Sequence, residues 1–174
     1  MSLDAVQANI SLHHLEIKSR DPKRLAEFYS IVMNMKINRL TNQKFLCEGP
    51  GRKIIITTGK NKTLAYAGMV CKNKENLERY KEFLKMNKCE INAFVSEFYH
   101  SGSFALQDPD NNMICFGVLK KENNFLKKGI YAPLQHLTFA SKDVERFQNF
   151  YQRKLGFQVT DRVVKSTGEL ATSF

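Results

Sequence analysis

Apolar and polar residues follow the same order three times along this chain. Each time, a short stretch in which every second residue is apolar leads into a longer stretch with apolar residues three and four positions apart. Strict alternation is typical of a strand with one buried face, and the wider spacing is typical of a helix with one apolar side. The pattern therefore predicts three strand–helix units, which begin near Leu12, Leu64 and Leu134.

The residues themselves repeat as well. Residues 14–37 align without a gap on residues 136–159, 122 positions later, and seven of the 24 pairs are identical. A weaker copy with the same apolar spacing covers residues 66–91. Repetition of a whole strand–helix–strand unit indicates a duplicated architecture.

The first copy predicts which side chains face a hollow. Alternation places Leu15 and Ile17 on one face of the first strand and His14 and Glu16 on the other. The Asp-Pro pair at 21–22 then starts a helix, with a carboxylate cap and a proline in the first turn. The helix is expected to cover the Leu15 face, so His14 and Glu16 should face the space around which the sheet curves.

Each complete unit is expected to be βαβββ. Two such units, residues 11–59 and 64–119, form an N-terminal module (1–119), and a polar, charged linker follows at 120–133. An incomplete third unit at 134–174 opens a second module, and the repeat implies a fourth unit beyond Phe174. The expected fold class is α+β, with paired βαβββ units forming a half-open barrel, followed by the incomplete third unit. The predicted strands are 12–19, 36–39, 44–48, 52–58, 64–70, 91–97, 103–107, 112–119, one from 134, 157–164 and one from 170.

Composition excludes several classes of function. The net charge is +10, but the 27 lysines and arginines are scattered, and no RNA-binding or helix-turn-helix pattern accompanies them. No run of about 18 apolar residues suggests a membrane span. The four cysteines lack disulfide-like or metal-binding spacing, which favours a reducing compartment. The expectation is a cytoplasmic protein without nucleic-acid or membrane partners.

Three stretches resemble one known group of proteins. They are HHLEIKSRDPKRLAEFYSIVMNM (13–35), FALQDPDNNMICFGV (104–118) and QHLTFASKDVERFQNFYQRKLGFQVTDRV (135–163). Together they resemble the vicinal-oxygen-chelate superfamily of glyoxalases, bleomycin-resistance proteins and extradiol dioxygenases. The pattern is most like a two-module type I extradiol ring-cleaving dioxygenase of the catechol 2,3-dioxygenase kind, truncated in its second module.

The resemblance implies metal-ligand positions in the first module. At those positions this sequence has His14, Ile55, Tyr66 and Cys115. Isoleucine cannot bind a metal, tyrosine is a poor ligand, and Cys115 stands where the family usually has glutamate. Glu16 shares the hollow and is the one further side chain that could be recruited. All five residues are therefore expected to face the hollow without serving as ligands, and His14 and Cys115 have ordinary structural roles in this interpretation.

His136 has a different expected role. It opens the second module where the resembling dioxygenases place their first iron ligand, although a lone strand histidine can also be structural. The resemblance implies Fe(II) held by two histidines and one carboxylate, and an aromatic diol opened with O2. The other ligands and the acid–base residue would lie beyond Phe174, so this chain should contain no catalytic residue and should be inactive alone. An unpaired sheet edge would invite pairing between copies, as in a homo-oligomer.

Two other functions remain open at this point. One is a metal-free binding module of the bleomycin-resistance type, which would hold an aromatic ligand between its units. The other is a glyoxalase- or epimerase-like metalloenzyme, which would need His14 and an acidic partner. Exchange of His14 would abolish activity only in the second case.

Overall fold

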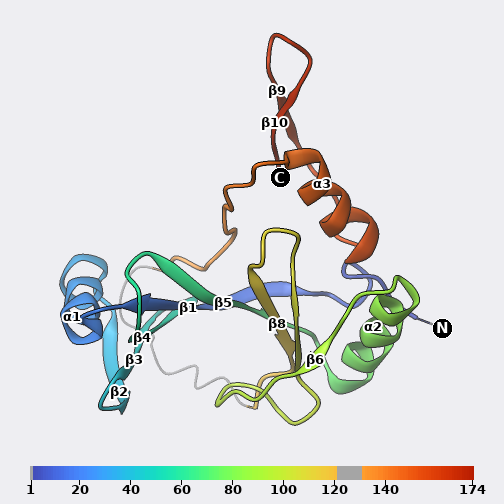
Figure 1. Cartoon of the computed structure of the whole chain (residues 1–174). Helices are drawn as coiled ribbons and strands as arrows, with labels where there is room; N and C mark the ends of the chain where they lie inside the picture. The colour runs from blue at the N-terminus through green and yellow to red at the C-terminus, as the bar shows by residue number, and fades with distance from the viewer. Residues whose placement is uncertain (1, 121–130) are drawn as a thin grey trace.

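The computed structural model describes residues 2–120 and 131–174. Within them, an eight-stranded sheet is flanked by two helices, and a third helix and a two-stranded hairpin stand apart from it (Figure 1). The strands of the large sheet are β1 (Ser11–Ser19), β2 (Lys36–Thr41), β3 (Lys44–Gly49), β4 (Arg52–Thr58), β5 (Thr63–Val70), β6 (Asn92–Ala93), β7 (Phe104–Gln107) and β8 (Met113–Gly117). The helices beside it are α1 (Pro22–Met33) and α2 (Lys74–Met86). No described helix is both long enough and apolar enough to cross a bilayer.

The order of the strands confirms the paired units. The sheet runs β2-β3-β4-β1-β5-β8-β7-β6, so each unit contributes four strands in the same internal order. In each unit the first strand lies parallel to the last, as β1 with β4 and β5 with β8. The two units meet where β1 and β5 pair antiparallel at the centre of the sheet. The predicted α+β fold of duplicated βαβββ units is therefore correct.

Both helices beside the sheet begin with a side-chain cap, which was predicted for the first of them at Asp21. Asp21 accepts a hydrogen bond from the Arg24 N–H at 3.0 Å, and Asn73 accepts one from the Asn76 N–H at 2.8 Å. The apolar sides of α1 and α2 then cover the outer face of the sheet. Ile17 packs into the cluster beneath α1, whereas Leu15 packs against the cluster beneath α2.

The opposite face of the sheet lines the hollow of the first module. Its buried cluster consists of Leu46, Ile55, Tyr66, Tyr99, Ala105 and Cys115. The prediction of a strand over 91–97 is correct only for β6 and wrong for the residues after it, because the chain leaves the sheet after Ala93. Phe94 and Phe98 instead lay their rings against this cluster. The hollow is filled by aromatic side chains from its own module.

The third unit lacks one predicted element. Its helix forms as α3 (Val144–Asn149) and continues as a π-helical turn, η1 (Phe150–Lys154), before the hairpin of β9 (Arg162–Val164) and β10 (Leu170–Ser173). The strand predicted from 134 is absent, and the one predicted over 157–164 is confined to β9. A strand needs a hydrogen-bonded neighbour. Leu134 still donates its N–H to the Gly51 carbonyl at 3.3 Å, but the described residues provide no backbone partner beside 135–140.

The third unit packs on the first module through its helix. The Tyr80 hydroxyl donates to the Leu155 carbonyl at 3.0 Å, and the Tyr151 hydroxyl donates to Asp108 Oδ2 at 3.1 Å. Of the linker predicted at 120–133, residues 121–130 lie outside the described residues. The two hydrogen bonds from Tyr80 and Tyr151 therefore join the third unit to the first module.

Candidate functional site

The structure brings the five first-module candidates into one patch. In the strand register, His14 lies opposite Gly68, and Gly68 lies opposite Cys115. Glu16 lies opposite Ile55 on one side and opposite Tyr66 on the other. His14, Glu16, Ile55, Tyr66 and Cys115 therefore share the inner face of the sheet. What surrounds them decides whether they can reach a ligand.

His14 is sealed inside the hollow. Its side chain is fully buried, its Nε2 lies 3.2 Å from the Tyr66 hydroxyl, and its Nδ1 lies 2.9 Å from the Nδ1 of His13. The ring centroids of Phe98 and Tyr99 lie 4.8 and 5.4 Å from that of the imidazole. These rings occupy the space through which a substrate or a metal would approach.

Burial also fixes the charge of this histidine. The pKa of His14 is lowered from 6.5 to about 3, mainly because burial removes solvent from the ring and also because His13, Lys53 and Lys44 lie nearby. The imidazole is therefore neutral at physiological pH. Both of its nitrogens already face protein partners.

Glu16, the carboxylate that shares the hollow with His14, already has an ion-pair partner. Lys44 Nζ lies 3.0 Å from Glu16 Oε2 and 3.2 Å from Glu97 Oε1. Its ammonium group bridges two carboxylates and holds Glu16 as part of an ion-pair network. The carboxylate thus has a cationic partner from β3 in the same hollow.

Tyr66 and Cys115 are held in their neutral forms. Burial raises the pKa of the Cys115 thiol well above its usual value, and the Glu16 carboxylate raises it further. Burial likewise raises the pKa of the Tyr66 hydroxyl. A thiol binds metal as the thiolate, so this pocket disfavours the form that a metal needs. In residues 2–120 and 131–174, no three His, Cys, Asp or Glu side chains are grouped so that they could hold a metal ion.

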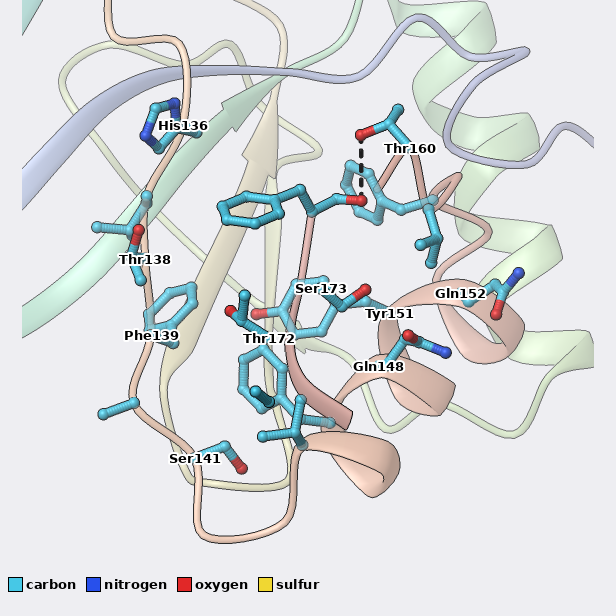
Figure 2. A pocket seen from close by; sticks show the side chains of 18 of the residues that line it. His136, Thr138, Phe139, Ser141, Gln148, Tyr151, Gln152, Thr160, Thr172 and Ser173 are labelled. Atoms are coloured by element: carbon cyan, nitrogen blue, oxygen red, sulfur yellow. Dashed lines mark hydrogen bonds between the residues drawn. The ribbon is translucent and has the colours of Figure 1, made fainter. Parts of the chain in front are cut away.

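His136 lies in a contrasting environment. It is exposed, in an extended segment that runs past α3 and β10. Figure 2 shows His136 and Thr138 on the side of this segment that faces away from α3, whereas Phe139 points toward the helix. The alternation predicted for a strand at 134–140 is therefore present in the side chains, although no ladder forms there.

A pocket of about 600 Å³ lies between this segment, α3 and β10. Its volume is in the range of small-molecule sites. Its lining includes the ring of Phe147. The rings of Phe139 and Tyr151 add apolar surface, and Gln148 and Thr172 supply polar groups (Figure 2). Its lining contains no side-chain carboxylate, no thiol and no second histidine. One imidazole does not fit the three protein donors of an iron site with two histidines and a carboxylate, so the described residues do not form one.

Sequence patterns alone miss the side chains that close the first hollow. Phe94, Phe98 and Tyr99 lie in or next to the stretch predicted as a regular strand, and Glu97 reaches Lys44 from the same segment. The signal that could have identified them is the density of aromatic residues between positions 94 and 99. A regular strand would point such a series alternately to both faces of the sheet.

Comparison with known proteins gives a consistent picture of the fold. The family model described as the Glyoxalase/Bleomycin resistance protein/Dioxygenase superfamily matches residues 11–116 and 134–173. No curated protein matches the chain.

Similar solved structures include ring-cleaving dioxygenases. A catechol 2,3-dioxygenase shares 16% identity, with a TM-score of 0.77 over 99% of this chain and 62% of that protein. Homoprotocatechuate 2,3-dioxygenase from Arthrobacter globiformis shares 16% identity, with a TM-score of 0.78 over 94% of this chain and 55% of that one. A variant of the Brevibacterium fuscum enzyme shares 15% identity, with a TM-score of 0.77 over 94% and 49%. The chain thus spans 49–62% of the length of these structures, and at this identity the likeness concerns the fold.

Proposed function

The chain belongs to the glyoxalase/bleomycin resistance protein/dioxygenase superfamily, and we propose that the whole protein is an extradiol ring-cleaving dioxygenase. In this proposal the substrate is a catechol-type aromatic diol, the co-substrate is O2, and the metal is Fe(II). His136 is one of the iron ligands. Catechol and homoprotocatechuate are the substrates in the names of the similar structures.

The contrast between two equivalent histidines carries the proposal. His14 and His136 occupy the same place in the repeat, 122 positions apart. His14 is fully buried among aromatic rings, whereas His136 is exposed and points away from its own helix (Figure 2). An accessible imidazole can bind a metal, and a sealed one with both nitrogens engaged cannot do so without opening the core.

His136 supplies only one of the three donors that the proposed site needs. The remaining histidine and carboxylate would come from outside the described residues, as would the group that handles protons. The 174-residue chain alone is therefore expected to bind iron weakly and to leave catechols intact.

The first module has a supporting role in this proposal. Its closing hairpin holds α3, because Arg146 lies 2.6 Å from Asp110 and Tyr151 donates a hydrogen bond to Asp108. Its own hollow is filled by the rings of Phe94, Phe98 and Tyr99. We infer that it positions the second module and carries out no chemistry itself.

The filled hollow also argues against a glyoxalase- or epimerase-like site in the first module. Such a site would use His14 with an acidic partner, but Lys44 engages Glu16 and aromatic rings cover His14. A metal-free binding role remains a second candidate, favoured by the aromatic rings in the pocket beside α3. Binding of a planar aromatic ligand that a chelator does not affect would support that role.

The proposal is tested by oxygen consumption with catechol after anaerobic loading with Fe(II). We expect the complete gene product to consume O2 and open the ring, and the 174-residue chain to do neither. Ring cleavage by the 174-residue chain at a rate comparable to that of a longer product would overturn the assignment. Failure of the complete product to react with any catechol would overturn it as well.

The cytoplasm is the proposed location. All four cysteines are free thiols in the structure, and three of them are buried. Free thiols are the normal state in a reducing compartment.

A further inference from the structure

Another pocket lies in the first module, at the edge of the sheet where β6 ends. Its volume is about 570 Å³, which is in the range of small-molecule sites, and it shares no lining residue with the pocket beside α3. It is formed by side chains from residues 91–104, together with Lys81 of α2 and Lys120 after β8. The iron site proposed at His136 uses none of these residues.

The wall of this pocket is a loop that hydrogen bonds hold closed. At its base, the Phe94 N–H donates to the Ser103 carbonyl at 3.1 Å, and the Ser103 hydroxyl donates to the Phe94 carbonyl at 2.6 Å. Within the loop, the His100 N–H donates to the Val118 carbonyl of the chain after β8 at 2.8 Å. The pocket is therefore preformed, and a ligand does not have to order the loop in order to bind.

Two ammonium groups reach this pocket from different elements. Lys81 Nζ lies 5.7 Å from the centre of the Phe104 ring, and its ion pair with Glu78, at 3.9 Å, is of the exposed kind that contributes little. Lys120 Nζ donates to the Ser96 carbonyl at 3.2 Å, and an ammonium group has three N–H donors, so it can also donate to a ligand. Among the described residues that line the pocket, none has a carboxylate side chain. The charge in the pocket is therefore positive.

Aromatic rings supply apolar surface to the same pocket. Phe94 is only partly buried, and its ring centroid lies 6.5 Å from that of Tyr99, which also lines the pocket. Such rings favour a planar apolar body over a small inorganic ion. Tyr99 also contacts His14, with the two ring centroids 5.4 Å apart. A ligand that contacts Tyr99 would therefore stabilise the loop in the position that covers His14.

We propose that this pocket binds a small aromatic anion. Its planar body lies against Phe94 and Tyr99, and its carboxylate or other anionic group is held by Lys81 and Lys120. The two lysines select for negative charge, because charge-assisted hydrogen bonds are stronger than neutral ones. Binding involves no chemical step, and the inference depends neither on iron nor on the proposed dioxygenase function.

The test is an NMR titration of the isotope-labelled 174-residue chain with naphthoate. Amide shifts should concentrate in residues 91–104, and Lys81→Met or Lys120→Met should each raise the dissociation constant by about tenfold or more, as for a lost charge-assisted hydrogen bond. Lys74→Met is the matched control, because it removes the same charge from the exposed start of α2, outside the pocket. It should change the affinity by less than about twofold, since a distant exposed charge is screened. On the unaltered chain, the neutral analogue naphthylmethanol should bind at least about tenfold more weakly than naphthoate.

Several results would overturn the proposal. Absence of binding at millimolar naphthoate is one, and amide shifts centred on the pocket beside α3 or spread over the whole surface are another. Equal affinity for naphthoate and its neutral analogue is a third, since the lysines would then play no part. Loss of affinity in Lys74→Met equal to that in Lys81→Met would also contradict it, because the anion would then respond only to the net charge of the chain.

Discussion

The imidazole of His14 lies directly over Gly68, its neighbour across the β1–β5 pair. A β-carbon placed on Gly68 would fall well inside contact distance of three atoms of the ring. The glycine is thus the reason that a full-sized side chain can lie flat against the inner face of the sheet. The arrangement fixes the histidine where Phe98 and Tyr99 can cover it.

Gly68→Ala should lower the free energy of unfolding by about 1–3 kcal/mol, because the added methyl group forces the buried ring to move. Urea denaturation measures the change. Gly59→Ala is the matched control, since its nearest neighbour is the flexible side chain of Lys18, and it should stay within about 0.5 kcal/mol of the original. Equal losses in both variants would show that His14 is not held against the strand.

Stability should fall in acid because of His14. Its pKa is about 3 in the folded chain and 6.5 when the side chain is fully solvated, so between these values the unfolded state binds the additional proton. The stability that the folded state keeps by holding His14 neutral is complete above about pH 6.5. It decreases by about 1.4 kcal/mol per pH unit below that value. His14→Gln should remove roughly 2 kcal/mol of the loss between pH 6.5 and pH 5. The same pH slope in both proteins would argue that water reaches the ring.

The Lys44 bridge gives a third prediction. Lys44→Met leaves two carboxylates, Glu16 and Glu97, without their shared cation, and Glu16 is largely buried. The unfolding free energy should drop by about 3 kcal/mol, as for a broken buried ion pair. Adding Glu16→Gln to this variant should restore a large part of the loss. If the double variant is as unstable as the single one, Lys44 contributes through packing alone.

The contact between modules gives a fourth prediction. Tyr80→Phe removes the buried hydrogen bond to the Leu155 carbonyl and should cost about 1–3 kcal/mol. Hydrogen exchange should increase in α3 and η1 more than in β1, because the lost bond holds the third unit to α2. A uniform increase across the chain would mean that the bond contributes to global stability and does not specifically hold the third unit to α2.

Much of the fold was predictable because it rests on local patterns. The alternation around His14, the caps at Asp21 and Asp143 and the repeat at His136 each reflect short-range rules of strands and helices. The same rules placed His14 and Glu16 on one face of the sheet, whereas the expected position of Cys115 came from the resemblance to the superfamily. These features need no knowledge of what packs against them.

The misjudged elements depend on partners distant in sequence. Residues 135–140 alternate like β1 but have no described neighbour to pair with, so the same pattern gives a strand in one unit and an open segment in the other. Phe98 and Tyr99 resemble strand residues, yet burying their rings over His14 outweighs a regular ladder at that edge. No local pattern could reveal that the first hollow is closed by its own loop.

The central claim is that the duplicated histidines have separated in role, with His14 structural and His136 a metal ligand. The most direct measurement is the iron content and catechol-dependent O2 consumption of the complete protein carrying either His14→Gln or His136→Gln. We predict that His136→Gln abolishes iron retention and ring cleavage while thermal unfolding stays unchanged. His14→Gln should lower stability but keep iron and activity in the molecules that remain folded. Loss of iron in a folded His14→Gln protein, with iron retained in His136→Gln, would contradict the account.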